Sequence, residues 1–297
     1  MPQKLAFTTL DVFTSTRFSG NPLAIVHLPI SVNLTQVQKQ LIAREFNLSE
    51  TVFLHESPPE SVAVVEIEIF TRTEELPFAG HPVVGSAWYL LSRNEQLATA
   101  TIRTKAGDIA AHRESTGKAR VTVPIDFRIH PSYAHPGLKP LQHRLQGEDY
   151  VNGPDAAEPV VSIVKGMTFI LLELSTEDAL SRLQPFPSRL AMPEGHLGDW
   201  KGLVGLYAFV QCRDGTIRTR MFDGVIEDPA TGSAASALAG WLAIKKGCGT
   251  GRFNIVQGVE MRQRSEISVE VEVGDAEVKS VEIEGSAVKV MGGWLEI

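Results

Sequence analysis

Cysteine is scarce in this sequence of 297 residues, because only Cys212 and Cys248 are present. Two cysteines are too few for the disulfide framework of a small secreted domain or for a cysteine zinc site. The eight histidines also show no metal-ligand spacing. We therefore expect no metal and a reducing, cytoplasmic environment.

Long apolar runs and basic runs are also missing. No apolar stretch approaches the ~20 residues that span a membrane. The formal net charge is −7, and no cluster of Lys or Arg would follow a phosphate backbone. These absences argue against a membrane partner and against nucleic acid.

The sequence contains no convincing cofactor motif. No glycine-rich dinucleotide turn follows an expected strand. The segment 247–252 is rich in glycine, but it lacks the Gly-Lys-Ser/Thr ending of a phosphate loop and follows a helix. Gly247 is better interpreted as the residue that ends this helix. We therefore expect no cofactor.

An internal repeat dominates what is present. The length favours two domains of about 150 residues, and the 43% apolar content is sufficient for two cores. Two stretches match at one constant offset, and Tyr89 faces Trp241 in the same register. The matched pairs are Phe70 and Phe222, Glu75 and Glu227, Pro77 and Pro229, Gly80 and Gly232, Ala87 and Ala239, and Leu90 and Leu242.

Each copy of the repeat reads as an extended segment, an acidic turn with Pro and Gly, and a helix without a polar face. Such a helix belongs inside a core. Two of them suggest a duplicated unit, whereas the plainer alternative is coincidence between two glycine-containing turns. We predict an α+β protein with two pseudo-symmetric domains, 1–125 and 126–297, each a sheet wrapped around a central helix. The last strand is a candidate to return to the first domain.

The remaining elements follow from hydrophobic periodicity and turn residues. A surface helix is expected over 33–46, with Asn33 as its cap and Asn47 as its stop. Four prolines place the crossing between the halves within 126–158. The expected strands are 5–13, 23–28, 52–54, 62–70, 99–104, 108–113, 119–123, 159–164, 167–174, 203–212, 216–222, and three within 266–291.

The starts of the two central helices are candidate binding positions. Pro82 fits the first helical position after Gly80 and His81, and Gly232 and Ser233 open the second helix. Helix starts offer unpaired N–H groups and partial positive charge, which suits a small carboxylate. If the duplication is real, both starts face one cleft between the halves. Alternatively, the glycines serve only turn geometry.

Three side chains are candidates for acid/base chemistry. Glu50 lies between a helix end and a strand start, flanked by Ser49, which we include as a substrate-binding candidate. His81 and Asp228 precede the central helices. The plainer interpretation makes Glu50 a solvated acid, His81 a helix cap and Asp228 a turn residue.

Several motifs together resemble a known family. Segments Asp11–Phe13 with Phe18–Pro22, Asn47–Thr51, Phe78–Pro82 and Glu227–Ser233 occur in this order. They resemble the signatures of the PhzF family of phenazine-biosynthesis-like isomerases, which have the diaminopimelate epimerase-like fold. The resemblance spans nearly the whole chain.

The resemblance implies a cofactor-free, usually homodimeric isomerase. A characterised member of the family moves a proton along a conjugated dihydro-hydroxyanthranilate. By motif, Glu50 would be the catalytic acid/base, and the substrate cleft would contain Gly80, His81, Asp228, Gly232 and Ser233. The related epimerases use paired cysteines at the helix starts, where this sequence has none.

Three departures from the family pattern concern the substrate more than the fold. Glu68 stands where the family commonly has an arginine, Arg72 replaces a common proline, and the turn at 222–227 is a few residues short. We predict a cofactor-independent isomerase that moves a proton on a small unsaturated or cyclic carboxylate. The competing prediction is a non-catalytic protein that binds small carboxylates through the same helix starts.

Overall fold

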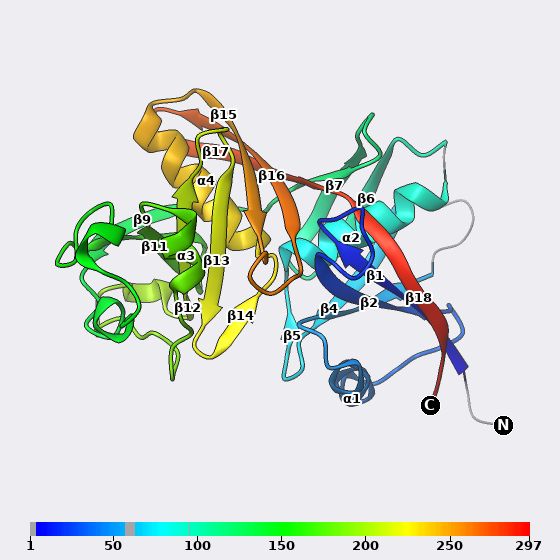
Figure 1. The fold of residues 1–297 in the computed structure, drawn as a ribbon. Helices are drawn as coiled ribbons and strands as arrows, with labels where there is room; N and C mark the ends of the chain where they lie inside the picture. Colours follow the sequence, from blue (N-terminus) through cyan, green and yellow to red (C-terminus); the bar gives the residue numbers. More distant parts are fainter. Residues whose placement is uncertain (1–3, 57–62, 95) are drawn as a thin grey trace. The chain divides into compact units, whose positions relative to one another are not determined.

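The computed structural model describes residues 4–56, 63–94 and 96–297 of the chain, and they form a mixed α+β structure made mostly of strands (Figure 1). The predicted α+β class is confirmed. The chain divides into two compact units. Unit 1 contains Met1–Val123 and Ile283–Ile297, and unit 2 contains Pro124–Glu282.

Unit 1 combines two helices with strands from both ends of the chain. Its elements are β1 (Lys4–Val12), β2 (Asn21–Leu28), α1 (Gln36–Phe46), β3 (Thr51–His55), β4 (Val64–Phe70), β5 (Glu75–Leu76), α2 (Gly80–Arg93), β6 (Thr99–Thr104), β7 (Gly107–Arg113), β8 (Ala119–Thr122) and β18 (Ala287–Glu296).

Helix α2 is the central helix of unit 1. It packs against β1, β2, β3, β6, β7, β8 and β18. Val83, Val84 and Ala87 are fully buried along it. Gly85 permits this close packing, since a Cβ there would lie 2.6 Å from Cδ2 of Leu23. The apolar surface of α2 therefore accounts for its burial among the strands.

Strand β18 joins the two separate segments of unit 1. It pairs antiparallel with β1 from Lys4 opposite Glu296 to Val12 opposite Ala287 (Figure 1). β1 also pairs with β2, and β2 runs parallel to β3. Met291 and Trp294 of β18 remain exposed.

Helix α1 differs slightly from the expected surface helix. Its cap is Thr35 and not Asn33, because the Thr35 side chain accepts from the backbone N–H of Gln38 in a capping box. Asn47 ends the helix in the left-handed conformation, as predicted. The Lys39 side chain is buried, although α1 lies at the surface of unit 1.

Unit 2 carries the remaining elements. They are β9 (Arg128–Tyr133), β10 (Glu158–Val164), β11 (Met167–Glu173), α3 (Glu177–Arg182), β12 (Leu203–Gln211), β13 (Ile217–Asp223), β14 (Ile226–Asp228), α4 (Gly232–Lys246), β15 (Thr250–Gln257), β16 (Ser265–Gly274), β17 (Glu277–Gly285, whose last residues enter unit 1), and short 3-10 turns at Lys139–Leu141, Gly147–Asp149 and Gly198–Trp200.

Helix α4 is the central helix of unit 2. It packs against β10, β11, β15 and β16. Nearly all residues from Gly232 to Ala243 are buried. Gly247 ends the helix with φ of 65°, as predicted. None of the helices in the described residues is long and apolar enough to cross a membrane.

The sequence repeat corresponds to the same local structure in both units. Phe70 pairs with Glu75 across the β4–β5 hairpin, and Phe222 pairs with Glu227 across the β13–β14 hairpin. In each copy the central helix begins five residues after the glutamate. The repeated spacing therefore reflects one hairpin-to-helix arrangement that is built twice.

Several predicted boundaries were wrong. α2 begins at Gly80 and not at Pro82, because the helical conformation already starts after the extended Ala79. β9 lies inside the segment expected to be a crossing, and both β15 and the six-residue α3 were missed. The expected start of the strand at 62–70 lies outside the described residues.

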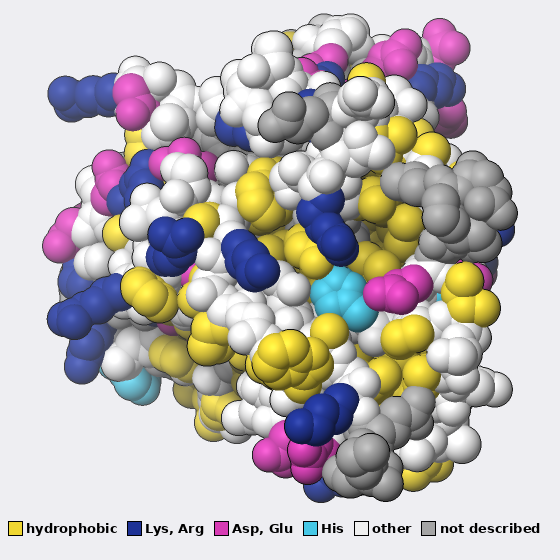
Figure 2. Space-filling view, turned by 90° about the vertical axis from the view of Figure 1, so that its right-hand side faces the viewer, with side chains coloured by type: hydrophobic (Ala, Val, Ile, Leu, Met, Phe, Trp, Pro, Cys, Tyr) yellow, Lys and Arg dark blue, Asp and Glu magenta, His cyan; other side chains and the backbone are white. Residues whose placement is uncertain are grey.

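The surface seen in Figure 2 mixes side chains of all kinds. Hydrophobic side chains are exposed at several separate points, with acidic and basic side chains between them.

Candidate active site

His81 lies in the first turn of α2, and its side chain is only 5% exposed. The next residue is Pro82, which has no backbone N–H and fits the first turn of a helix without loss. The Nε2 atom of His81 is buried and has no hydrogen-bond partner among the described residues. Such an orphaned atom at the start of a helix is suited to bind a ligand.

Glu50 lies directly beside this histidine. It precedes β3, and its Oε2 atom is 3.4 Å from Nδ1 of His81. The Glu50 side chain is 17% exposed, so a carboxylate accessible from outside meets a buried imidazole. The structure thus brings together two of the three predicted acid/base residues.

Asn21 extends this cluster and was missed in the sequence. Its Nδ2 atom lies 3.4 Å from Nδ1 of His81, and its Oδ1 accepts from the Ser49 hydroxyl at 3.3 Å. Ser49 is therefore connected to His81 through Asn21. The available signal was a polar residue at the buried start of β2.

The turn before β2 positions Asn21. Asp11 accepts a hydrogen bond from the backbone N–H of Phe18 at 2.6 Å. Burial raises the pKa of Asp11, and hydrogen bonds from the backbone of Phe18 and Ser19 oppose this shift. Gly20 has φ of 70°, and a Cβ there would lie 2.3 Å from the Val12 carbonyl oxygen. The turn thus requires glycine immediately before Asn21.

The protonation state of His81 follows from its burial. Burial lowers the pKa of His81 to about 3, with a smaller opposing effect from the backbone of Pro22. The imidazole is therefore neutral at pH 7. A neutral imidazole has one nitrogen that donates and one that accepts, and the two can exchange these roles. His81 can therefore serve as either donor or acceptor without carrying a buried charge.

Gly80, another predicted residue, opens α2 in unit 1 and is buried, whereas the remaining predicted residues belong to unit 2. Asp228 ends β14, and its carboxylate accepts from the Thr231 hydroxyl and, at 3.4 Å, from the backbone N–H of Ala230. Gly232 and Ser233 form the first turn of α4, and both are buried. The N-cap residue Thr231 makes no side-chain cap to this turn. The first backbone hydrogen bond of the helix runs from the Ala235 N–H to the Thr231 carbonyl oxygen. Gly232 and Ser233 come before Ala235, so their N–H groups have no partner within the helix.

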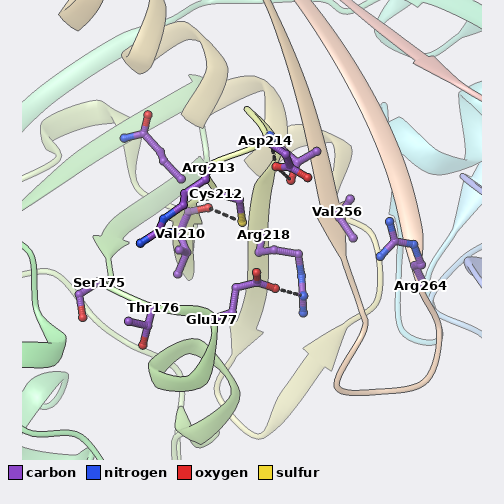
Figure 3. Close-up of a pocket in the computed structure, with 12 residues that line it drawn as sticks. Ser175, Thr176, Glu177, Val210, Cys212, Arg213, Asp214, Arg218, Val256 and Arg264 are labelled. Carbon is purple, nitrogen blue, oxygen red and sulfur yellow. Dashed lines mark hydrogen bonds and ion pairs between the residues drawn. The ribbon is translucent and has the colours of Figure 1, made fainter.

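A cavity of about 500 Å³ lies elsewhere in unit 2, around the β12–β13 hairpin and α3 (Figure 3). None of the predicted site residues lines it. Arg218 in its wall pairs with Glu177 and, at 2.8 Å, with Glu260. Because internal partners already compensate this charge, the cavity is a weaker candidate than the Glu50–His81 cluster.

Comparison with known families identifies the chain. The model of the phenazine biosynthesis-like protein family, PhzC-PhzF, matches residues 10–293. The chain belongs to this PhzF family. The resemblance seen in the sequence motifs is thereby confirmed, and this PhzF protein is an isomerase, as the names of several curated relatives indicate.

Two relatives show how far the similarity extends. An uncharacterized isomerase of Pasteurella multocida is 33% identical to this PhzF protein, over 98% of this chain and 93% of the relative. The trans-2,3-dihydro-3-hydroxyanthranilate isomerase of Pseudomonas fluorescens is 31% identical over 95% of this chain and 96% of the relative.

Solved structures share the fold of this PhzF protein. A PhzF-family phenazine biosynthesis protein of Bacillus anthracis aligns with a TM-score of 0.79, at 22% identity, over 99% of this chain and 100% of that one. A hydroxyproline epimerase of Agrobacterium vitis aligns with a TM-score of 0.63, at 11% identity, over 100% of this chain and 94% of that one.

Proposed function

We propose that this protein is a cofactor-independent isomerase that moves a proton on a small unsaturated or cyclic carboxylate, with Glu50 as general acid/base. The observation that carries the proposal is the 3.4 Å approach of Glu50 to the buried His81. Family membership supports the reaction type, since relatives are named as isomerases.

The reaction needs one carboxylate that acts twice. Glu50 removes a proton from one carbon of the substrate, and the electron pair of that C–H bond enters the conjugated system. The Glu50 carboxyl group, which is 17% exposed and can therefore exchange its proton with water, then gives a proton to a second carbon, where the conjugated system supplies the new bonding pair. No electron leaves or enters the substrate, so the step requires no oxidant.

His81 and Asp228 orient and polarise the conjugated part of the substrate in this proposal. The buried Nε2 atom of His81 supplies a hydrogen-bonding group without a charge, since the imidazole is neutral. A preorganised group of this kind stabilises charge as it develops in the transition state.

The substrate carboxylate is assigned to backbone N–H groups. Gly80 and His81 open α2, while Gly232 and Ser233 open α4. The positive end of each helix dipole favours an anion at these positions. Ser49, beside the catalytic acid, completes the proposed substrate-binding residues.

We further propose that the two units are pseudo-symmetric halves, and that the protein is a homodimer. The repeated hairpin-to-helix arrangement in both units supports the first statement. The homodimer rests on the family resemblance alone, and light scattering tests it: a mass near 32.4 kDa would contradict it.

The test is solvent deuterium incorporation. Trans-2,3-dihydro-3-hydroxyanthranilate is the probe, because a relative is named for its isomerisation. In D₂O the wild-type protein should incorporate deuterium during turnover, and Glu50→Gln should lower the rate at least about a hundredfold while ligand affinity stays within a few fold. Glu45→Gln on the exposed face of α1 is the matched control and should behave as wild type.

Two outcomes contradict the proposal in different ways. Near-normal turnover in Glu50→Gln would show that Glu50 is not the base. Tight binding by the wild type with neither isomerisation nor deuterium exchange would favour a protein that only binds small carboxylates.

A further inference from the structure

Gln257 is the last residue of β15, and it is fully buried. Its Oε1 accepts from the Tyr207 hydroxyl at 3.0 Å and from the Thr231 N–H at 3.3 Å. Its Nε2 donates to the Asp228 carbonyl oxygen at 2.7 Å and to the Thr231 hydroxyl at 3.0 Å. An amide has two donor hydrogens and two acceptor lone pairs, so all of its capacity is used.

Thr231 transmits this arrangement to the Asp228 carboxylate. Its hydroxyl oxygen accepts from Gln257, and its hydroxyl hydrogen donates to Oδ2 of Asp228. Since the lone pair facing Gln257 is occupied, the hydroxyl hydrogen points toward the carboxylate. Hydrogen bonds to an ionised acceptor are stronger than neutral ones, and a buried network strengthens each member.

Tyr207 fixes the other end of the network. It is fully buried on β12, and burial raises its pKa, so its hydroxyl keeps its proton at neutral pH. The hydroxyl donates to Oε1 of Gln257, which is the orientation of the amide that the Thr231 N–H and the Asp228 carbonyl oxygen require. Tyr207 of β12 pairs with Met221 of β13, and Met221 pairs with Asp228 of β14. Adjacent strands therefore hold Tyr207 and Asp228, the two ends of the network.

The turn between Asp228 and Thr231 is also packed from the side of β15. Gly258 follows Gln257 with φ of 75°, and a Cβ at Gly258 would lie 2.7 Å from the Pro229 carbonyl oxygen. The backbone after β15 thus approaches the same turn that Gln257 binds. Two independent contacts therefore restrict the segment that leads into α4.

We propose that Tyr207, Gln257 and Thr231, here named the Gln257 clamp, position the Asp228 carboxylate and the first N–H groups of α4 for the isomerisation. Gln257 and Thr231 are positioning residues that act through Asp228. This inference rests on the proposed function, which assigns Asp228 to the substrate. A purely structural clamp would stabilise the fold without affecting turnover.

Substitutions at Thr231 separate these two roles. Thr231→Val removes the hydroxyl and keeps the shape and the backbone N–H, whereas Thr231→Ser keeps the hydroxyl. The control is Thr168→Val, which removes another buried hydroxyl of unit 2, bonded to Ser162 at 2.7 Å. The probe is again trans-2,3-dihydro-3-hydroxyanthranilate.

For Thr231→Val we expect kcat to fall at least about tenfold with KM within about threefold, because misorientation of a catalytic group mainly affects the transition state. Thr231→Ser should restore kcat to within about threefold, and Thr168→Val should leave it unchanged. A wild-type kcat in folded Thr231→Val would overturn the positioning role.

Hydrogen exchange gives a readout that does not depend on turnover. In Thr231→Val the amides of 226–235 should exchange at least about tenfold faster than in wild type, while Thr168→Val leaves this segment unchanged. If the wild type fails to isomerise the probe, the proposed function fails for that substrate. Unchanged exchange in 226–235 would instead overturn the clamp itself.

Discussion

Glu68 is an unusual charged residue on β4, because its side chain is only 12% exposed. It accepts hydrogen bonds from His55 at 2.7 Å, from Gln36 at 3.1 Å and from the buried Lys39. Burial alone would raise the pKa of Glu68, but these donors outweigh it and lower the pKa to about 2. Glu68 thus attaches α1 to β4.

We expect Glu68→Gln to destabilise the fold by about 3 kcal/mol at pH 7, since it leaves the Lys39 ammonium buried without its ion pair. The folded-state pKa lies below the ordinary value of 4.5. The stabilisation is therefore present above that pH and is lost as the pH falls toward 2. Urea unfolding at several pH values measures it.

Glu66→Gln is the matched control for this prediction. Residue 66 is an exposed glutamate on the same strand, and the substitution should change stability by no more than about 0.5 kcal/mol. If the difference between wild type and Glu68→Gln stays the same at pH 7 and pH 3, the ion pair is not its cause.

At the scale of elements, α2 depends on the glycine that lets it approach the strands of unit 1. Replacing glycine by alanine inside a helix normally favours folding by up to about 1 kcal/mol. At Gly85 the new methyl group would lie 2.6 Å from Leu23 and 2.8 Å from Val12. We therefore expect Gly85→Ala to destabilise the protein by about 1 to 3 kcal/mol through overpacking.

Thermal unfolding measures the effect of Gly85→Ala. The control is Ser92→Ala, near the exposed end of the same helix, which should change stability by no more than about 0.5 kcal/mol. A Gly85→Ala protein more stable than wild type would show that α2 can move away from β1 and β2 at little cost.

The central helices could be predicted because their signal is local and occurs twice. Apolar residues on every side of α2 and α4 indicate burial without knowledge of their neighbours. β15 was missed because Gly249 precedes it and Gly251 interrupts its strand pattern, although Phe253 and Ile255 are buried. α3 was missed because it has six residues, which is too short for apolar side chains to recur at helical spacing.

The candidate site was predictable only in part. Motif resemblance selected Glu50 and His81, but their 3.4 Å approach depends on how α2 packs near the start of β3. Asn21 and Gln257 act through tertiary contacts with residues far along the chain. Their only local signal is a polar side chain at a buried strand position, which does not reveal its partner.

At the scale of the molecule, unit 1 is discontinuous, since it combines Met1–Val123 with Ile283–Ile297. Removal of residues 286–297 would take away β18, the antiparallel partner of β1 along its length. We expect β1 and α2 to lose hydrogen-exchange protection in this truncated protein. Unit 2 is continuous and should keep its protection.

Exchange measured by mass spectrometry resolves the two units separately. Full protection of β1 and α2 after the truncation would mean that β18 contributes little to unit 1. Equal loss of protection in both units would mean that they unfold as one cooperative body.

The pairing of β1 with β18 also sets an order of events on the ribosome. β1 is synthesised well before β18, which emerges only after unit 2 is complete. At ordinary translation rates that interval is on the order of tens of seconds. During this time the N-terminal strand presents an open edge to other nascent chains, while unit 2 can already mature. Joining Lys4 to Glu296 and opening the chain at a surface turn would remove this delay.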